Sequence, residues 1–250
     1  MLILGIDIGS SNIGAGIVDT STGTIVGERY RIDIEQDLSP HRVMAQVHEI
    51  LNHFQWNGPL GCAFPAPIVN GVIIDALYLN PSWDNVDLEQ LLYEISDQPV
   101  VVVNDADAAG IAEMRFGAGK GESGVVIVLT IGTGIGSSIF VNHHLLPNTE
   151  LGRLEIRGIS ARERASERVK KEEGLKKSTW AKRIELVLGA FERIFYPDLF
   201  IFAGGMSKKV EKISEFMDIK TPYVAAKLLN NAGIIGAALY TEQRIQNQAT

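Results

Sequence analysis

An amide and two carboxylates lie close together at positions 104 to 107, where the sequence reads Asn104-Asp105-Ala106-Asp107. A carboxylate in such a group can accept a proton from a hydroxyl, and it can also hold a cation. The simplest alternative is that one aspartate only caps a helix. The sequence favours this structural role for one of the two aspartates and a chemical role for the group as a whole.

A strand and a helix must position this group. The residues just before it, Val100-Val101-Val102-Val103, are all β-branched, which is typical of a strand buried on both faces of a parallel sheet. The Ala-rich residues that continue through Glu113 predict a helix. Ligands of open α/β sheets bind outside the carboxyl ends of the strands, and a helix N-terminus favours an ionised carboxylate. We therefore expect a functional site where this strand meets this helix.

Two further predicted strands end in turns of small residues. Strand 2–8 leads into Gly9-Ser10-Ser11, and strand 124–130 leads into Gly132-Thr133-Gly134, within a longer turn that we expect to end at Ser138. Glycine lets backbone N–H groups approach phosphate oxygens closely. Neither segment has the Walker A pattern or the dinucleotide-binding pattern. The pair predicts two phosphate-binding loops, although a glycine turn often only reverses the chain.

Asp7 stands at the end of the first predicted strand, just before the first of these turns. A carboxylate beside bound phosphates is normally neutralised by Mg²⁺, directly or through water. Asp7 is therefore the candidate magnesium ligand, and the alternative is an aspartate that caps the turn.

The wider pattern predicts an α/β protein with a duplicated architecture. Strands 13–18 and 24–34 continue the first strand as an antiparallel meander, which differs from a βα unit. Because strand, turn and strand recur near residue 134, we expect two α/β domains. These are residues 1–116, with the C-terminal helix 231–247 packed back on them, and residues 117–230. Further helices are predicted after Ser39-Pro40 and at 86–95, 162–183 and 180–194, and further strands at 58–64, 68–77 and 198–203.

Composition and charge limit the class of protein. The chain has 250 residues, of which 46% are hydrophobic and 21% charged, enough for a sizeable core. Its formal net charge of −7 argues against nucleic-acid binding, and no apolar run is long enough to span a bilayer. The single cysteine, Cys62, excludes an internal disulfide and a cysteine-based zinc cluster. The N-terminus enters the first strand directly, so we expect a cytoplasmic protein without membrane or nucleic-acid partners.

Several segments, taken in order, resemble the signature segments of the ROK family of sugar kinases. The similarity covers nearly the whole chain and is strongest to the polyphosphate glucokinase subgroup, which also lacks the zinc-binding cysteines of many ROK proteins. The segments that carry the resemblance are Asp7-Ile8-Gly9-Ser10, Asn80-Pro81-Ser82-Trp83, residues 104–110, 129–136 and 147–152, Gly204-Gly205-Met206-Ser207 and residues 230–238.

The resemblance implies an actin/hexokinase-like (ribonuclease H-like) fold, with two α/β domains flanking a cleft. It also implies transfer of a terminal phosphoryl group from inorganic polyphosphate or ATP to the 6-hydroxyl of a hexose, with Mg²⁺ and without zinc. The implied catalytic base is Asp105, which leaves the helix-capping role to Asp107. The implied sugar ligands are Asn80, Asn104, Asp105, Glu150 and Arg153. The implied phosphate ligands are Asp7, Gly9, Ser10, Ser11, Thr130, Gly132, Thr133 and Gly134, and the implied nucleotide or distal-phosphate ligands are Gly204, Gly205 and Ser207.

Three positions depart from the family pattern. Ser10-Ser11 replaces a Gly-Gly pair, Gly14 replaces a lysine, and Arg153 replaces the histidine that follows Glu-Leu-Gly. A family glutamate also falls near Arg162 or Glu163. An arginine only donates hydrogen bonds and carries a fixed charge, unlike a histidine. The alternatives are therefore a kinase for another sugar, such as a negatively charged one, or a degenerate ROK-like protein that binds a sugar or phosphate without efficient catalysis.

Two expectations remain from the family and from charge. Many ROK proteins are dimers, so the same analogy predicts a homodimer. The lysines and arginines of the charged stretch 162–183 would attract a polyphosphate chain, which is a polyanion. Interleaved glutamates such as Glu163 and Glu167 would instead pair with them on a solvated helix. We favour the ion-paired helix.

Overall fold

The structure is a computed structural model that describes residues 1–34 and 39–248. It divides into two compact units, Met1–Ala112 with the C-terminal segment from Asn231, and Glu113–Asn230. Each unit is built on a mixed five-stranded sheet with helices, which confirms the predicted α/β fold class. The chain passes from one unit to the other inside helix α3 (Asp105–Phe116). None of the described helices combines the length and the apolar character needed to cross a membrane.

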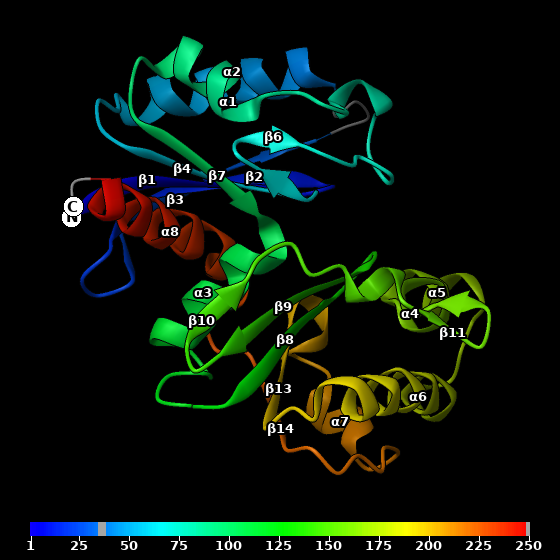
Figure 1. Cartoon of the computed structure of the whole chain (residues 1–250). Helices are drawn as coiled ribbons and strands as arrows, with labels where there is room; N and C mark the ends of the chain where they lie inside the picture. The colour runs from blue at the N-terminus through cyan, green and yellow to red at the C-terminus, as the bar shows by residue number, and fades with distance from the viewer. Residues whose placement is uncertain (35–38, 249–250) are drawn as a thin grey trace. The chain divides into compact units, whose positions relative to one another are not determined.

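The sheet of the first unit has the strand order β3-β2-β1-β4-β7 (Figure 1). Its first three strands form the predicted antiparallel meander, and the other two run parallel to β1. The strands are β1 (Leu2–Ile8), β2 (Asn12–Asp19), β3 (Thr24–Asp33), β4 (Leu60–Phe64) and β7 (Val100–Asn104), with a small hairpin of β5 (Ile68–Val69) and β6 (Val72–Ile73). The helices are α1 (Pro40–Phe54), η1 (Pro81–Trp83), α2 (Leu88–Ser96), α3 and α8 (Ala232–Gln248). The short helix η4 (Leu229–Asn231) spans the point where the chain returns from the second unit.

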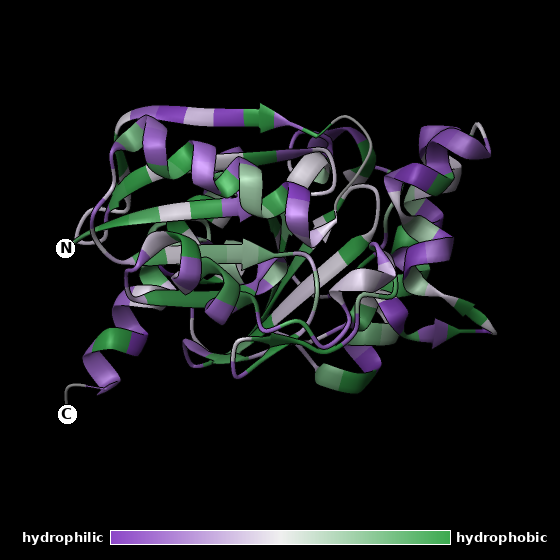
Figure 2. Ribbon diagram, turned by 90° about the horizontal axis from the view of Figure 1, so that it is seen from above, coloured by the Kyte–Doolittle hydropathy of each residue, from purple (hydrophilic) through white to green (hydrophobic). Residues whose placement is uncertain are grey.

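Different helices cover the two faces of this sheet. Helices α1 and α2 lie on one face, and α8 lies on the other (Figure 1). Helix α1 forms because Pro40 suits the first helical turn and because apolar residues recur at helical spacing; Val43, Val47, Ile50 and Leu51 are all buried. Hydrophilic and hydrophobic residues alternate along such helices, as Figure 2 shows. The main core therefore lies between this helical pair and the sheet.

Helix α8 packs unusually close to the other face. A Cβ atom on Gly5 of β1 would collide with the carbonyl of Ile234, and one on Gly61 of β4 would collide with the carbonyl of Ala237. On the helix itself, a Cβ on Gly236 would collide with the carbonyl of Ala108. Glycine is required at these positions because it has no side chain to hold the backbones apart.

The sheet of the second unit repeats this plan, with the order β10-β9-β8-β13-β14. Three antiparallel strands are again followed by two parallel ones, which confirms the predicted duplication. The strands are β8 (Val125–Ile131), β9 (Ile135–Val141), β10 (His144–Leu146), β13 (Leu199–Ala203) and β14 (Tyr223–Ala225), with a hairpin of β11 (Glu155–Ile156) and β12 (Ile159–Ser160). The helices are η2 (Leu151–Arg153), α4 (Ala161–Ala165), α5 (Glu167–Glu172), α6 (Lys177–Phe195), η3 (Gly204–Met206) and α7 (Val210–Ser214).

The prediction of one charged helix over 162–183 is wrong, because the stretch is divided among α4, α5 and α6. Ser166 ends α4 and caps α5, where its hydroxyl accepts a hydrogen bond from Val169 N–H at 3.3 Å. Gly174, with φ +61°, turns the chain after α5. The favoured ion pairing is confirmed for Glu163, since Arg168 lies 2.6 Å from Glu163 and 2.8 Å from Glu172. It is wrong for Glu167, which is buried and pairs with Lys209 outside the stretch.

Candidate active site

Three parallel strands bring the predicted residues of the first unit to one edge of its sheet. Strands β1, β4 and β7 run in the same direction, so their carboxyl ends lie together. Asp7 and the turn Gly9-Ser10-Ser11 belong to the end of β1, and Asn104 and Asp105 to the end of β7. The predicted base and the predicted first phosphate turn thus share an edge.

Asn104 is the residue that caps α3. Its Oδ1 accepts hydrogen bonds from the N–H groups of Ala106 at 2.9 Å and Asp107 at 3.1 Å, and its Nδ2 donates to the carbonyl of Ala66 at 3.2 Å. Asp107 is the third residue of the helix and only 1% exposed. The prediction that Asp107 caps the helix is wrong, because the preceding asparagine already holds the first N–H groups. These bonds also fix the Asn104 amide in place.

Asp105 begins α3 and keeps partial exposure, in contrast to Asp107. Its Oδ1 accepts a hydrogen bond from Ala106 N–H at 2.7 Å. The N-terminal end of a helix favours negative charge at this position. A carboxylate with these properties and access to solvent can accept a hydroxyl proton.

Asn80 stands on a turn tied to the same edge of the sheet. Its Oδ1 accepts hydrogen bonds from Ser82 N–H at 3.0 Å and Ser82 Oγ at 2.7 Å, and so caps η1. That short helix carries the fully buried Trp83, whose ring lies 4.8 Å from the ring of Phe64, the last residue of β4. A buried aromatic anchor therefore positions the Asn80 turn.

The turn after β1 is closed by its backbone. Gly9 N–H donates to the carbonyl of Asn12 at 2.9 Å, and Ser10 and Ser11 at its tip are exposed. Backbone N–H groups and hydroxyls at an exposed turn suit the binding of phosphate oxygens.

Asp7 projects from β1 toward the start of α8. A Cβ atom on Gly233, the second residue of that helix, would collide with the Asp7 carboxylate. Desolvation raises the pKa of Asp7 from 3.8 to about 6, and the positive charge of Arg29 partly opposes this rise. Asp7 is therefore ionised at neutral pH but easily protonated. Arg29 was not among the residues predicted for the site.

In the second unit, β8 and β13 place two predicted phosphate segments side by side. Thr130 of β8 pairs with Ala203 of β13, so the turns that follow both strands lie at one edge. In the first turn, Gly132 N–H donates to the carbonyl of Gly134 at 3.0 Å. In the second, Gly204 adopts φ +65°. The position that a Cβ on Gly204 would take lies 3.4 Å from the carbonyl oxygen of Ile131.

The first of these turns is shorter than predicted. Strand β9 already begins at Ile135, so Gly136, Ser137 and Ser138 belong to the strand. Ser137 and Ser138 are buried and pair with β8, which explains why small polar residues here do not form a loop. The exposed tip is Thr133.

Charged residues that the sequence did not assign to the site lie against both turns. The guanidinium carbon of Arg162 is 3.1 Å from the place a Cβ on Gly134 would take. Glu167 Oε1 is 2.8 Å from the corresponding place on Gly205 and forms an ion pair with Lys209 Nζ at 2.7 Å. Glu167 N–H also donates to the carbonyl of Gly132 at 2.9 Å. For this region the sequence favours a solvated helix over a phosphate-binding role.

Ser207, predicted as a nucleotide ligand, closes the second turn. Its hydroxyl donates to the carbonyl of Gly204 at 2.8 Å, and the residue is 9% exposed. Its hydroxyl thus stabilises the Gly204-Gly205 turn from within.

Glu150 and Arg153 form an ion pair across η2. Arg153 Nε donates to Glu150 Oε2 at 3.1 Å, with side chains 27% and 30% exposed. Between them, Gly152 packs so tightly that a Cβ would collide with the carbonyl of Ile135. The arginine that replaces the family histidine is therefore paired with a predicted sugar ligand.

The side chains present fit a magnesium ion that takes part of its ligands from the substrate. In the part of the chain that the structure describes, no three His, Cys, Asp or Glu side chains gather to hold a metal ion. Magnesium, however, is usually bound by one or two carboxylates together with substrate phosphates and water. The single Asp7 carboxylate, next to a phosphate-type turn, fits such a ligand.

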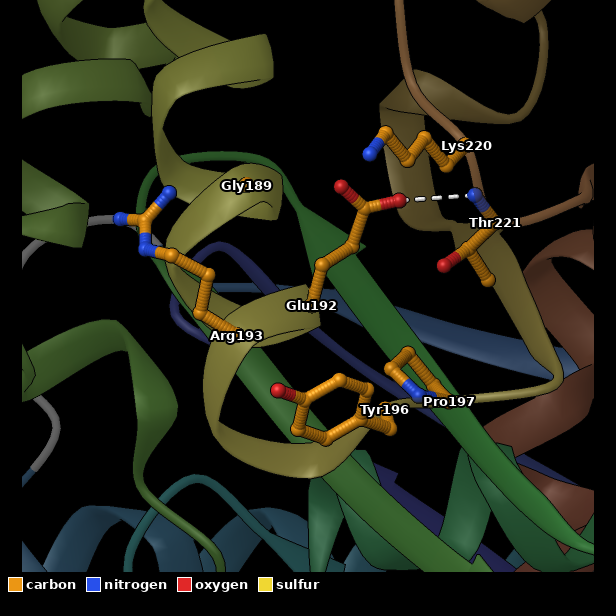
Figure 3. A pocket seen from close by; sticks show the side chains of 7 residues that line it. All are labelled: Gly189, Glu192, Arg193, Tyr196, Pro197, Lys220 and Thr221. Carbon is orange, nitrogen blue, oxygen red and sulfur yellow. Dashed lines mark hydrogen bonds between the residues drawn. The ribbon is translucent and has the colours of Figure 1, made fainter.

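The second unit also contains a pocket of about 540 Å³ at the amino end of β13 (Figure 3). Its wall includes Glu192, which accepts a hydrogen bond from Thr221 N–H at 2.7 Å. None of the predicted site residues lines it, and it lies at the opposite end of β13 from the Gly204 turn. The lining residues are Gly189, Glu192, Arg193, Tyr196, Pro197, Lys220 and Thr221.

Comparison with known proteins adds to this geometry. The family model described as "ROK family" matches residues 3–152. The polyphosphate glucokinase of Mycobacterium tuberculosis is 44% identical over 236 residues, which cover 94% of this chain and 89% of that protein. The polyphosphate glucokinase of Mycobacterium leprae is 43% identical over 94% of this chain and 73% of that protein.

Solved structures agree over nearly the whole chain. The inorganic polyphosphate/ATP-glucomannokinase from Arthrobacter sp. strain KM superposes with a TM-score of 0.93 and 39% sequence identity, covering 97% of this chain and 99% of that one. A ROK family glucokinase from Streptomyces griseus, solved with glucose and AMPPNP, has a TM-score of 0.83 at 21% identity, over 97% of this chain and 100% of that one. The second likeness establishes a shared fold.

Proposed function

This chain belongs to the ROK family, and from that premise we propose that it is a sugar kinase. It transfers the terminal phosphoryl group of inorganic polyphosphate, or of ATP, to the 6-hydroxyl of glucose. The observation that carries the proposal is 44% identity to polyphosphate glucokinases over 94% of the chain. The partly exposed carboxylate of Asp105, at the start of α3, supplies a group suited to the chemistry.

Asp105 acts as the base in this proposal. Phosphoryl transfer depends on in-line positioning and charge neutralisation more than on a strong base. A carboxylate that is ionised at neutral pH can take the hydroxyl proton as the new phosphorus–oxygen bond forms. Asn80, Asn104 and Glu150 hold the sugar hydroxyls, and Arg153 orients Glu150 through their ion pair.

Each sheet offers turns that suit the donor phosphates. In the first unit these are Asp7 and Gly9-Ser10-Ser11, and in the second they are Thr130 with Gly132-Thr133-Gly134. Gly204, Gly205 and Ser207 form the segment for the nucleotide or the distal phosphates. Asp7 would hold Mg²⁺, which when bound neutralises charge on the transferred phosphoryl group.

The proposal extends to the setting of the enzyme. We infer a cytoplasmic protein that acts on small molecules, and, by analogy with other ROK proteins, a homodimer. Sedimentation velocity of the full chain at several concentrations tests the dimer: a single monomeric species at all of them would exclude it.

An assay with a panel of sugars, each combined with polyphosphate and with ATP, tests the function. The proposal predicts glucose 6-phosphate from glucose with at least one of the two donors. A glucose-induced rise in melting temperature without turnover for any pair would instead favour the alternative of a degenerate ROK-like binder. That alternative is motivated by Gly14 and Arg153, the two positions where a family cation or histidine is replaced.

A further inference from the structure

We propose that Arg29 is a binding residue for the phosphoryl donor and supplies the cation of the first unit's phosphate site. The proposal deepens the proposed function and rests on it for the identity of the donor. It comes from a contact between three adjacent strands, in which Arg29 of β3 reaches over Gly14 of β2 toward Asp7 of β1.

The register of the sheet places Asp7 and Gly14 on one face. Asp7 pairs directly with Gly14 in the antiparallel ladder, so the side chain of Asp7 and the bare face of Gly14 point the same way. This is the face that α8 covers, since Ile234 Cδ1 lies 3.3 Å from the place a Cβ on Gly14 would take. The start of α8, where backbone N–H groups point outward, lies against the Asp7 carboxylate.

The guanidinium of Arg29 occupies the space that Gly14 leaves. Arg29 Nη2 is 3.0 Å, and Nε 3.5 Å, from the position of a Cβ on Gly14. Arg29 is also the positive charge that acts on the Asp7 carboxylate. A side chain at position 14 and the guanidinium of Arg29 therefore compete for the same volume, beside the carboxylate and the first phosphate turn.

Arg29 has hydrogen-bonding capacity left for a ligand. Its Nε is buried and has no hydrogen-bond partner among the described residues. A buried donor without a partner is unfavourable, so a ligand atom that accepts its hydrogen bond would stabilise the site. By contrast, Arg31 on the same strand is paired with Asp33 at 2.6 Å and is 53% exposed. The guanidinium fork matches phosphate oxygens well, so a phosphate chain at the neighbouring turn would satisfy Arg29.

The position of Arg29 explains why a glycine at position 14 is compatible with a phosphate site. A lysine there would place its charge on the same face of β2, next to Asp7. In this chain the charge arrives from β3 instead, and the glycine makes room for it. The phosphate site thus keeps a cation although the sequence shows none in the segment from Asp7 to Gly14.

Direct binding of a short polyphosphate tests the proposal without requiring turnover. Isothermal titration of the full chain with tripolyphosphate should give at least a tenfold lower affinity for Arg29→Ala than for the wild type. Arg31→Ala, which removes a surface arginine from the same strand, should bind like the wild type. In steady-state assays, Arg29→Ala should raise the KM for polyphosphate and leave the KM for glucose unchanged.

A double variant tests whether the positive charge, and not the arginine side chain itself, is what tripolyphosphate binding requires. Gly14→Lys in the Arg29→Ala background should recover most of the tripolyphosphate affinity, because the lysine fills the vacated space. Where Arg29→Ala lowers the melting temperature, Arg29→Gln keeps most of the side-chain volume and should show the same loss of affinity.

Wild-type affinity for tripolyphosphate in both the Ala and the Gln variant would overturn the proposal, as would a wild type that does not bind tripolyphosphate. A wild type that binds tripolyphosphate through Arg29 but phosphorylates no sugar would overturn the proposed kinase function and support the role of Arg29.

Discussion

Arg153 Nε donates a hydrogen bond to Glu150 Oε2 at 3.1 Å, across the single turn of η2. The pair neutralises the fixed charge that stands where the family has a histidine. A carboxylate offers several lone pairs, so Glu150 can still accept a hydrogen bond from a sugar hydroxyl. If Glu150 binds the sugar as proposed, the arginine acts on the sugar site through Glu150, and a neutral hexose remains the expected acceptor.

Replacing this arginine should weaken sugar binding modestly. Arg153→Ala should raise the KM for glucose roughly two- to fivefold, because a partly exposed ion pair contributes about 0.5–1 kcal/mol. The KM for the phosphoryl donor should not change. Arg157→Ala, which removes an exposed arginine nearby in the chain, serves as the control. A wild-type enzyme that prefers an anionic sugar acid to glucose would contradict this account.

The desolvated carboxylate of Asp7 should reduce the stability of the metal-free protein at neutral pH. Its pKa is about 6 in the folded chain and 3.8 without the surroundings. The folded state therefore binds the proton more tightly, and this group lowers stability as pH rises from about 4 to 6. A shift of this size corresponds to at most about 3 kcal/mol.

Asp7→Asn should consequently be more stable than the wild type at pH 7.5 and should lose kinase activity. Urea unfolding in EDTA at pH 5, 6 and 7.5 measures the effect. The stability advantage of the variant should grow with pH over this series and level off above pH 6. An advantage that is constant, or largest at pH 5, would show that desolvation of Asp7 is not the cause.

Two helical glycines should respond to alanine in opposite directions. Gly236→Ala should destabilise the chain by several kcal/mol, about 2–5 by comparison with other severe packing defects, because its Cβ collides with the carbonyl of Ala108. Gly189→Ala, in the interior of α6, has its nearest contact at 3.6 Å and should stabilise by up to about 1 kcal/mol. Thermal unfolding of both variants is the measurement. Equal effects would mean that α8 does not pack on the sheet as closely as described.

Much of the fold follows from patterns that the sequence displays openly. Strand β7 is an uninterrupted run of β-branched residues, and β1 ends at the residue expected, Ile8. The helix boundaries could not be predicted where several residues nearby can each cap a helix. Both Asn104 and Asp107 are good capping residues, and only the structure shows that the helix begins between them. Similarly, Ser166 divides a stretch that looks like one helix when only its charges are considered.

Some residues of the candidate site could likewise be predicted from the sequence, and others could not. Motif residues such as Asp105 and Gly132 could be identified because each follows the end of a predicted strand. Arg29 could not, because its position depends on the pairing of β3 with β2, where the register shifts between Ala15 and Ile17. Such a shift leaves no mark in the alternation of polar and apolar residues. Contacts across strands therefore had to come from the structure.

Formation of glucose 6-phosphate from glucose and polyphosphate, by the wild type and by Asp105→Asn in parallel, tests the central claim most directly. Turnover should fall by about 10²–10⁴-fold in Asp105→Asn, since a positioned base contributes on this scale, while the glucose-induced rise in melting temperature persists. Asp97→Asn, at the exposed end of α2, should behave as the wild type. Full activity in Asp105→Asn would contradict the account.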